Sequence, residues 1–255
     1  MKSSKRIKYN KSPLIEVVLQ LRFPTILSIG AGEPVKFQDK IRENFPFYQE
    51  GIQQQNELVV SSDGIPTQLK RSQLKIYNFF SKDKLNKISF TPSYINISTK
   101  NYIQWECFSQ NISTIIKIFQ EEYKPSFYTR VGLKYIDLIK RSKYGLENKK
   151  WSELIKPHIL GIVIPELEDG VRAYSTKAEF KNLKDNSFTK EQIEFVRVNN
   201  DTEVSLLIDC EYFTAELVKV DDLNNTMNLL HCNAKNFIDS VITKELSKAM
   251  EPVEI

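Results

Sequence analysis

The chain has 255 residues, of which 41% are hydrophobic, 11% are aromatic and only eight are glycine. This composition is typical of a globular protein and excludes a disordered, collagen-like or linker-rich chain. A chain of this length buries about three quarters of its unfolded surface when it folds, so its core needs no disulfides.

The net charge of +4 comes from the first eleven residues, which we expect to form a basic N-terminal tail. These residues carry five basic side chains and no acidic one, and 31 basic and 32 acidic groups remain in residues 12–255, a net charge of −1. Affinity for nucleic acid rises with the number of phosphates that a protein neutralises. The charge balance of residues 12–255 therefore gives little support for a dedicated nucleic-acid surface.

Cysteine usage and hydropathy predict a cytoplasmic protein. Cys107, Cys210 and Cys232 are far apart and form no CxxC pair, which fits a reducing compartment in which thiols act as small hydrophobic groups. No apolar segment follows the basic residues near Met1, and no stretch approaches 18 apolar residues. We therefore expect neither export nor contact with a membrane, and we expect all three cysteines to be structural.

Residues 12–124 are expected to form a first α+β half. Apolar alternation and turn residues predict a strand over 12–23, a short helix over 33–45, strands over 51–61, 73–81, 85–91 and 94–98, and an amphipathic helix over 101–123. That last helix carries aromatic residues at steps of three and four, and such a stripe is typical of a buried helix face.

Residues 125–255 are expected to form a second α+β half. The expected elements are a strand over 127–139, a helix over 151–156, strands over 171–183, 189–198 and 203–213, and a long helix that ends near residue 250. The segments SPLIEVVLQLRF and SFYTRVGLKYID share a leading serine, a valine five residues later and a leucine two further on. We therefore predict an internal duplication.

The expected fold is α+β, with two similar halves that each carry a long amphipathic helix on an antiparallel sheet and that share one core. No Pro-, Gly- or Ser-rich linker separates the halves, so we expect one inseparable unit. If the first strands of the halves run side by side, Glu16 and Arg130 occupy equivalent positions. We therefore predict an ion pair between them.

Four segments together resemble a known group of bacterial proteins. They are PLIEVVLQLRF, the set Tyr102, Trp105, Glu106 and Phe108, the strand RVGLKYID, and a last helical region with Leu230, His231, Phe237, Ile242, Thr243 and Leu246. Through their order and spacing, the chain resembles an uncharacterised, sporadically distributed bacterial family of about this length. The resemblance implies a cytoplasmic bacterial protein of a mobile or defence-associated gene cassette, and it implies no reaction.

Sequence motifs for catalysis, metal binding and cofactor binding are absent. The chain has two histidines and no HExxH, HxH, CxxC or GxSxG pattern, and the glycines at 30 and 32 lack the residues of a phosphate-binding loop. We therefore predict no catalytic residue, no metal ligand and no cofactor, and we favour a protein that is not an enzyme.

Two sets of charged residues are the candidate binding sites. Lys70, Arg71 and Lys75, together with Lys140 and Arg141, lie near tyrosines in the sequence, a combination that binds single-stranded nucleic acid when it forms one groove. Asp209 and Glu211 share one side of a predicted strand and form a possible acidic site. A two-metal nuclease would need further acidic residues to converge on this pair.

These observations lead to three functional hypotheses. The first is a non-enzymatic binding or adaptor subunit of a bacterial mobile or defence-type cassette, with a protein partner or a second copy of the chain. The second is a nucleic-acid-binding protein or a metal-dependent nuclease. The third is a sensor of a phosphate-containing ligand.

Overall fold

A computed structural model describes residues 7–60, 66–198, 201–234 and 237–254, and the side chains of residues 55–60 and 66–72 are outside this description. The chain divides into two compact units. Unit 1 contains residues 1–17, 132–214 and 224–255, and unit 2 contains residues 18–131 and 215–223. No helix in the described residues is long and apolar enough to cross a lipid bilayer.

Two strands, β2 (Leu14–Arg22) and β8 (Arg130–Ile139), contribute residues to both units, and the first residue of helix α6 (Leu223–Ala234) belongs to unit 2. The other elements of unit 2 are α1 (Leu27–Gly30), α2 (Val35–Ile41), β3 (Phe47–Val60), β4 (Pro66–Phe80), β5 (Asn86–Thr91), β6 (Tyr94–Thr99), α3 (Trp105–Tyr123), β7 (Phe127–Tyr128), β12 (Val218–Lys219) and η3 (Val220–Asp222). The other elements of unit 1 are β1 (Ile7–Tyr9), η1 (Arg141–Tyr144), α4 (Trp151–Leu154), α5 (Pro157–Leu160), η2 (Glu168–Gly170), β9 (Ser175–Lys181), β10 (Phe188–Val196), β11 (Ser205–Phe213), α6 (Leu223–Ala234), α7 (Phe237–Val241), α8 (Lys244–Ala249) and β13 (Pro252–Glu254).

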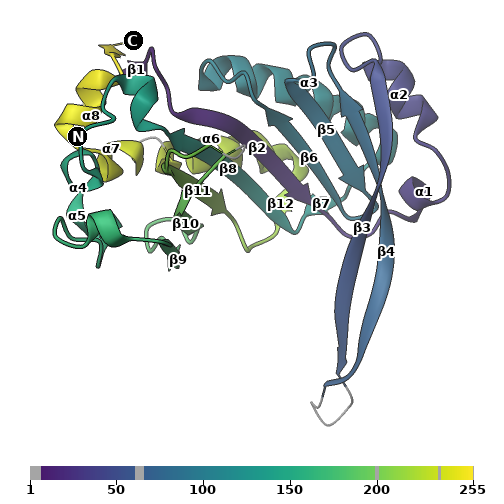
Figure 1. Ribbon diagram of the computed structural model, residues 1–255. Coiled ribbons are helices and arrows are strands. Elements are labelled where there is room, and N and C mark those ends of the chain that lie inside the picture. Colours follow the sequence, from purple (N-terminus) through teal and green to yellow (C-terminus); the bar gives the residue numbers. More distant parts are fainter. Residues whose placement is uncertain (1–6, 61–65, 199–200, 235–236, 255) are drawn as a thin grey trace. The chain divides into compact units, whose positions relative to one another are not determined.

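Nine strands follow one another in a single hydrogen-bonded sheet, in the order β3-β4-β5-β6-β2-β8-β11-β10-β9 (Figure 1). Every pair in this sheet whose register is described is antiparallel. Two short pairs, β1 with β13 and β7 with β12, complete the strands. The α+β fold class is therefore confirmed.

The strands predicted over 12–23 and 127–139 are neighbours in the sheet, as β2 and β8. A backbone hydrogen bond of 2.9 Å joins the Leu138 amide to the Pro13 carbonyl in unit 1, and one of 2.8 Å joins the Thr129 amide to the Arg22 carbonyl in unit 2. The alternating burial of β2 follows its sequence, because Val17, Leu19 and Leu21 point into the core while the residues between them are partly exposed.

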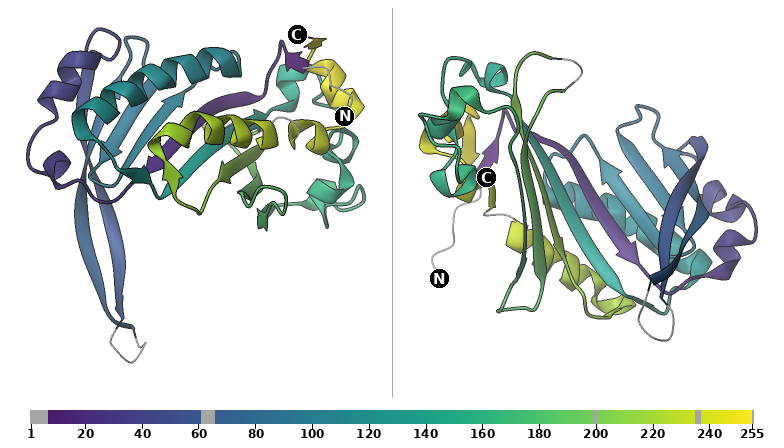
Figure 2. Two further views of the ribbon diagram at one scale, coloured as in Figure 1. Left: turned by 180° about the vertical axis from the view of Figure 1, so that it is seen from behind. Right: turned by 60° about the horizontal axis from the view of Figure 1, so that its bottom comes forward.

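The core of unit 2 is built from aromatic rings. Phe37 of α2 contacts the rings of Phe79, Phe90 and Phe119, with centroids 5.8, 5.0 and 6.1 Å away. Helix α3 carries the predicted apolar stripe and lies along one face of the sheet of this unit (Figures 1 and 2). It begins at Trp105, later than expected, because Gln104 is still extended.

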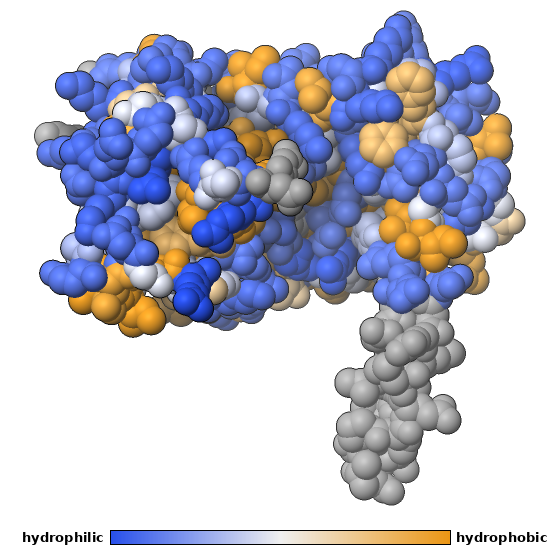
Figure 3. All heavy atoms as spheres, viewed as in Figure 1, coloured by the Kyte–Doolittle hydropathy of each residue, from blue (hydrophilic) through white to orange (hydrophobic). Residues whose placement is uncertain are grey.

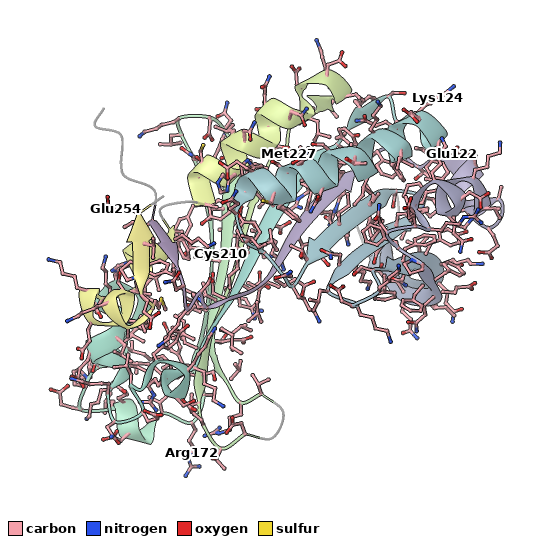
Figure 4. All side chains as sticks on the ribbon, turned by 90° about the horizontal axis from the view of Figure 1, so that it is seen from above. Glu122, Lys124, Arg172, Cys210, Met227 and Glu254 are labelled. Atoms are coloured by element: carbon pink, nitrogen blue, oxygen red, sulfur yellow. The ribbon has the colours of Figure 1, made fainter. Side chains whose placement is uncertain are left out.

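In unit 1, helix α6 lies along β8 and β11 (Figures 2 and 4). Met227 of this helix and Cys210 of β11 are both 2% exposed. The side chain of His231 contacts Tyr135 of β8, with 2.8 Å between Nδ1 and the phenol oxygen. His231 is therefore part of the contact between α6 and β8.

The prediction of one long helix that ends near residue 250 is wrong, because the last part of this segment forms two short helices, α7 and α8. Helix α7 ends at Val241, Ile242 forms an isolated bridge with Ile155, and the Thr243 amide donates to the Leu154 carbonyl over 2.9 Å. Thr243 then caps α8, its hydroxyl accepting from the Leu246 amide at 3.5 Å. Pairing with residues 154 and 155 thus interrupts an otherwise helical apolar pattern.

Candidate functional site

Strands β3 and β4 form a two-stranded ribbon that extends away from the rest of the sheet of unit 2 (Figures 1 and 2). Strand β4 pairs with β5 only over Tyr77–Phe80, whereas β3 and β4 pair along their whole lengths. Within the described residues, 51–60 and 66–76 are therefore paired in a sheet only with each other. At about 3.4 Å per residue, ten residues of antiparallel strand extend roughly 34 Å.

The ribbon is unusual because isolated two-stranded ribbons are marginally stable in water. Its outer edges offer backbone groups that no neighbouring described strand uses, and such edges pair readily with another chain. Among the side chains that are described, Ile52 is 66% exposed and Gln53 accepts a hydrogen bond of 2.8 Å from the Tyr94 phenol. The sequence of β3 includes the polar run Gln53, Gln54, Gln55 and Asn56, in which polar residues do not alternate with apolar ones.

A charged cluster holds the base of the ribbon. Lys75 Nζ lies 2.5 Å from Glu33 Oε1 and 2.8 Å from Glu50 Oε2, and the Tyr48 phenol donates to Glu33 over 2.7 Å. The hydrogen bond from Lys75 lowers the pKa of Glu33, and the hydrogen bond to Glu33 raises the pKa of Lys75. The charge of Lys75 is therefore neutralised by two carboxylates and is poorly placed to attract phosphate.

Unit 2 also contains a cavity of about 440 Å³ between α3 and the strands β5 and β6. Its polar and apolar lining comes from α2, from the turns near residues 81 and 101, and from α3. Figure 4 labels Glu122 and Lys124 at the end of α3, and Glu122 lies 3.5 Å from Lys40 at the cavity wall.

The predicted basic residues fall into two groups. Some have side chains outside the described residues, and the others contact carboxylates, a carbonyl or an aromatic ring. Lys70 and Arg71 lie on β4 of the ribbon, and their side chains are outside the described residues. Lys140 in unit 1 forms ion pairs with Asp201 and, over 3.7 Å, with Glu203. Arg141 stacks 5.0 Å from the Trp151 ring centroid, and its Nη1 donates to the Lys149 carbonyl. Whether these residues bind nucleic acid stays a prediction.

The predicted acidic pair lies on the half-exposed face of β11. Asp209 forms an ion pair of 2.9 Å with Lys134, and Glu211 lies two residues further along the same face. Cys210 between them is buried on the opposite face, as the strand alternation predicts. In the part of the chain that the structure describes, no three His, Cys, Asp or Glu side chains are placed to hold a metal ion.

The Arg130 guanidinium contacts Gln20 of the neighbouring strand, with Nη1 3.4 Å from Oε1. The ion pair between Glu16 and Arg130 stays a prediction. The expected structural role of the cysteines is wrong in part, because Cys107 and Cys232 are exposed and only Cys210 is buried.

Comparisons with known proteins give no family. No protein-family model matches the sequence, and no curated protein matches it either. The resemblance to a bacterial family therefore stays a prediction.

Sequence reasoning missed the length of the ribbon and the whole of the cavity. The run of glutamines at 53–55 next to Asn56 could have indicated a strand with no buried face, because its polar residues do not alternate with apolar ones. The cavity had no comparable signal, since its walls come from segments that each match an ordinary core or loop pattern.

Hydrophilic side chains cover most of the face seen in Figure 3, with small hydrophobic groups between them.

Proposed function

We propose that the protein is a non-enzymatic binding or adaptor subunit, which holds a protein partner or a second copy of itself through the β3–β4 ribbon. The ribbon is the observation that carries the proposal. A strand of a partner that pairs with either outer edge would extend the ribbon into a wider sheet and satisfy its unused backbone groups.

The order of elements supports two similar halves. In the first, β2 precedes two α-helices, a four-strand meander and α3. In the second, β8 precedes two α-helices and a three-strand meander before α6, with the short elements η1, η2, β12 and η3 between them. The ribbon strand pair of the first half is much longer than β9 and β10. If the fold is duplicated, the long ribbon is an addition to one half only, and we propose that partner binding depends on it. A cytoplasmic location and a place in a mobile or defence-type cassette belong to the same proposal.

The test removes the ribbon without removing its base. Gln54 and Gln73 are directly opposite each other, so an Asn-Gly turn between them closes a shortened hairpin. Tagged full-length and shortened proteins are purified from the native host, and their masses are measured by light scattering and their partners by mass spectrometry.

We expect the full chain to retain a stoichiometric partner or to form a dimer, and the shortened chain to lose either one. A shortened protein that keeps its circular dichroism spectrum and its partner contradicts the proposal. A full chain that is monomeric and retains no protein also contradicts it.

A second candidate function is nucleic-acid binding, because Lys70 and Arg71 lie on the ribbon and the major groove of DNA admits a two-stranded ribbon. The test is fluorescence anisotropy with single- and double-stranded DNA and RNA at low salt. Loss of binding in Lys70→Glu/Arg71→Glu, but not in the control Lys177→Glu/Lys181→Glu on β9, would support this function. Absence of binding at low salt excludes it. A phosphate-ligand sensor has less support, because the cavity wall has Lys40 as its one cationic side chain.

A further inference from the structure

The cavity beneath α3 has the size and the walls of a small-molecule site. Its volume of about 440 Å³ lies within the range of about 300–1,000 Å³ that ligand pockets occupy. Three different parts of unit 2 form it: the end of α2, the strands β5 and β6 with their turns, and α3 from Cys107 to Ile118. It lies wholly within one unit.

The floor of the cavity is apolar and aromatic. Ile41, Ile97 and Ile112 are each no more than 3% exposed, and the rings of Phe45 and Phe108 belong to the same wall. Aromatic and aliphatic walls favour a ligand with flat apolar faces, because burial of such faces removes apolar surface from water.

The mouth of the cavity carries amide side chains. Asn44, Asn101 and Asn111 are exposed lining residues, so their side-chain amides are accessible to a ligand. An amide side chain both donates and accepts, so three of them match a ligand edge on which donors and acceptors alternate.

The charge of the wall excludes a strongly ionic ligand. Lys40 is the only ionised lining residue, and it lies 3.5 Å from Glu122 and 3.8 Å from Glu121. A phosphate group would have to displace these carboxylates, and a cation would find no lining carboxylate.

We propose that this cavity binds an uncharged planar heterocycle of the nucleobase class, as the free base or the nucleoside. The ring stacks on the apolar floor and the asparagines bind its edge. This inference does not rest on the proposed role of the ribbon. Ligand binding in the cavity and partner binding by the ribbon are tested separately, so either proposal can fail while the other holds.

The exposed thiols provide a direct test. Cys107 lines the cavity, whereas Cys232 is an exposed thiol of unit 1 and serves as an internal control. The full chain is alkylated with iodoacetamide in the presence of adenosine, guanosine, cytidine, uridine or the free bases, and the modification of each cysteine is followed by mass spectrometry. At a ligand concentration about four times Kd, occupancy slows the alkylation of Cys107 about fivefold and leaves Cys232 unchanged.

Two variants of α3 complete the test by thermal shift. Asn111→Trp places a bulky group at the mouth, and Lys117→Trp places the same group at an exposed position of the helix outside the lining. We expect the ligand that protects Cys107 to raise the Tm of the native protein and of Lys117→Trp, but not that of Asn111→Trp.

Several results would overturn the proposal. They are the absence of protection by any base or nucleoside, equal protection of Cys107 and Cys232, and an unchanged thermal shift in Asn111→Trp. Binding of a nucleoside monophosphate more than about tenfold tighter than the nucleoside, a difference of about 1.4 kcal/mol, would also overturn it, since the ligand would then be an anion.

Discussion

Asp137 of β8 lies directly opposite Ile208 of β11 in the antiparallel pair that these strands form. Burial raises the pKa of the Asp137 carboxyl to about 7. Burial raises the pKa of Tyr144, Cys210 and Tyr212, and the nearby charge of Asp137 raises the pKa of each further. The phenol oxygens of Tyr144 and Tyr212 are buried without a hydrogen-bond partner among the described residues.

The raised pKa of the Asp137 carboxyl makes the protein less stable as the pH rises. Its carboxyl has a pKa near 3.9 in the unfolded chain and about 7 in the folded one, so the folded state keeps a proton that the unfolded state loses between these values. The free energy of unfolding therefore falls as the pH rises from about 4 to about 7. Burial raises the pKa of nearby Glu191 as well, which adds a contribution of the same sign.

We expect Asp137→Asn to stabilise the protein at pH 8 by up to roughly 4 kcal/mol, at about 1.4 kcal/mol per pKa unit, and to change its stability little at pH 4.5. Urea unfolding at both pH values measures the difference. Asp209→Asn is the control, because this carboxylate is half-exposed and paired with Lys134. An equal effect of Asp137→Asn at both pH values would contradict the assignment.

The three thiols are expected to differ in reactivity. Burial raises the pKa of Cys210, whereas Cys107 and Cys232 are exposed. In a native titration with a disulfide reagent at pH 8, two thiols should react quickly and the third only after unfolding. Cys210→Ala should leave the fast phase intact, and Cys107→Ala should halve it. Rapid reaction of three thiols in the native protein would refute the burial of Cys210.

Phe37 is expected to be the most costly truncation in α2. Its ring is fully buried among Phe79, Phe90 and Phe119, so Phe37→Ala should destabilise the protein by about 3–5 kcal/mol. Val35 of the same helix is 56% exposed, and Val35→Ala should cost less than about 0.5 kcal/mol. Chemical denaturation of the two variants gives the comparison, and similar costs would show that the ring is not part of the core.

The side-chain hydroxyl of Thr243 is expected to contribute to the stability of the protein. The hydroxyl accepts from the Leu246 amide at the start of α8 and donates to the Glu153 carbonyl over 2.8 Å. We expect Thr243→Ala to destabilise the protein by about 1–2 kcal/mol, since it removes both the cap and this hydrogen bond. Thr243→Ser keeps the oxygen and should recover most of the loss. Equal denaturation midpoints for the two variants would show that the hydroxyl contributes nothing.

Elements with one buried face were predictable from the sequence. The alternation of Val17, Leu19 and Leu21 identified β2, and the spacing of Phe108, Ile112 and Ile115 identified α3, because each pattern records which side of the backbone packs on the core. The ribbon strands extend beyond any core, so hydrophobicity could not mark their ends. The break at Thr243 depends on pairing with Leu154, which is distant in the sequence.

The sequence predicted which residue types form the candidate sites, but it did not predict which other residues these side chains contact. Lys75 and Lys140 are lysines of basic clusters in the sequence, yet each lies against carboxylates that the chain brings from elsewhere, Glu33 and Asp201 among them. The cavity depends on the approach of α2 to α3, which no local pattern reports.

The two strands that run through both units constrain how this gene can change by recombination. Strand β2 passes from unit 1 to unit 2 between Val17 and Val18, and β8 returns between Val131 and Gly132. Each unit is therefore encoded by separated stretches of the gene, and a single crossover with another gene within the codons of residues 18–223 would divide both units. Recombination can replace the ribbon between two neighbouring points in the gene, but it cannot exchange either unit in one step. New specificity would therefore arise most readily by exchange of the ribbon.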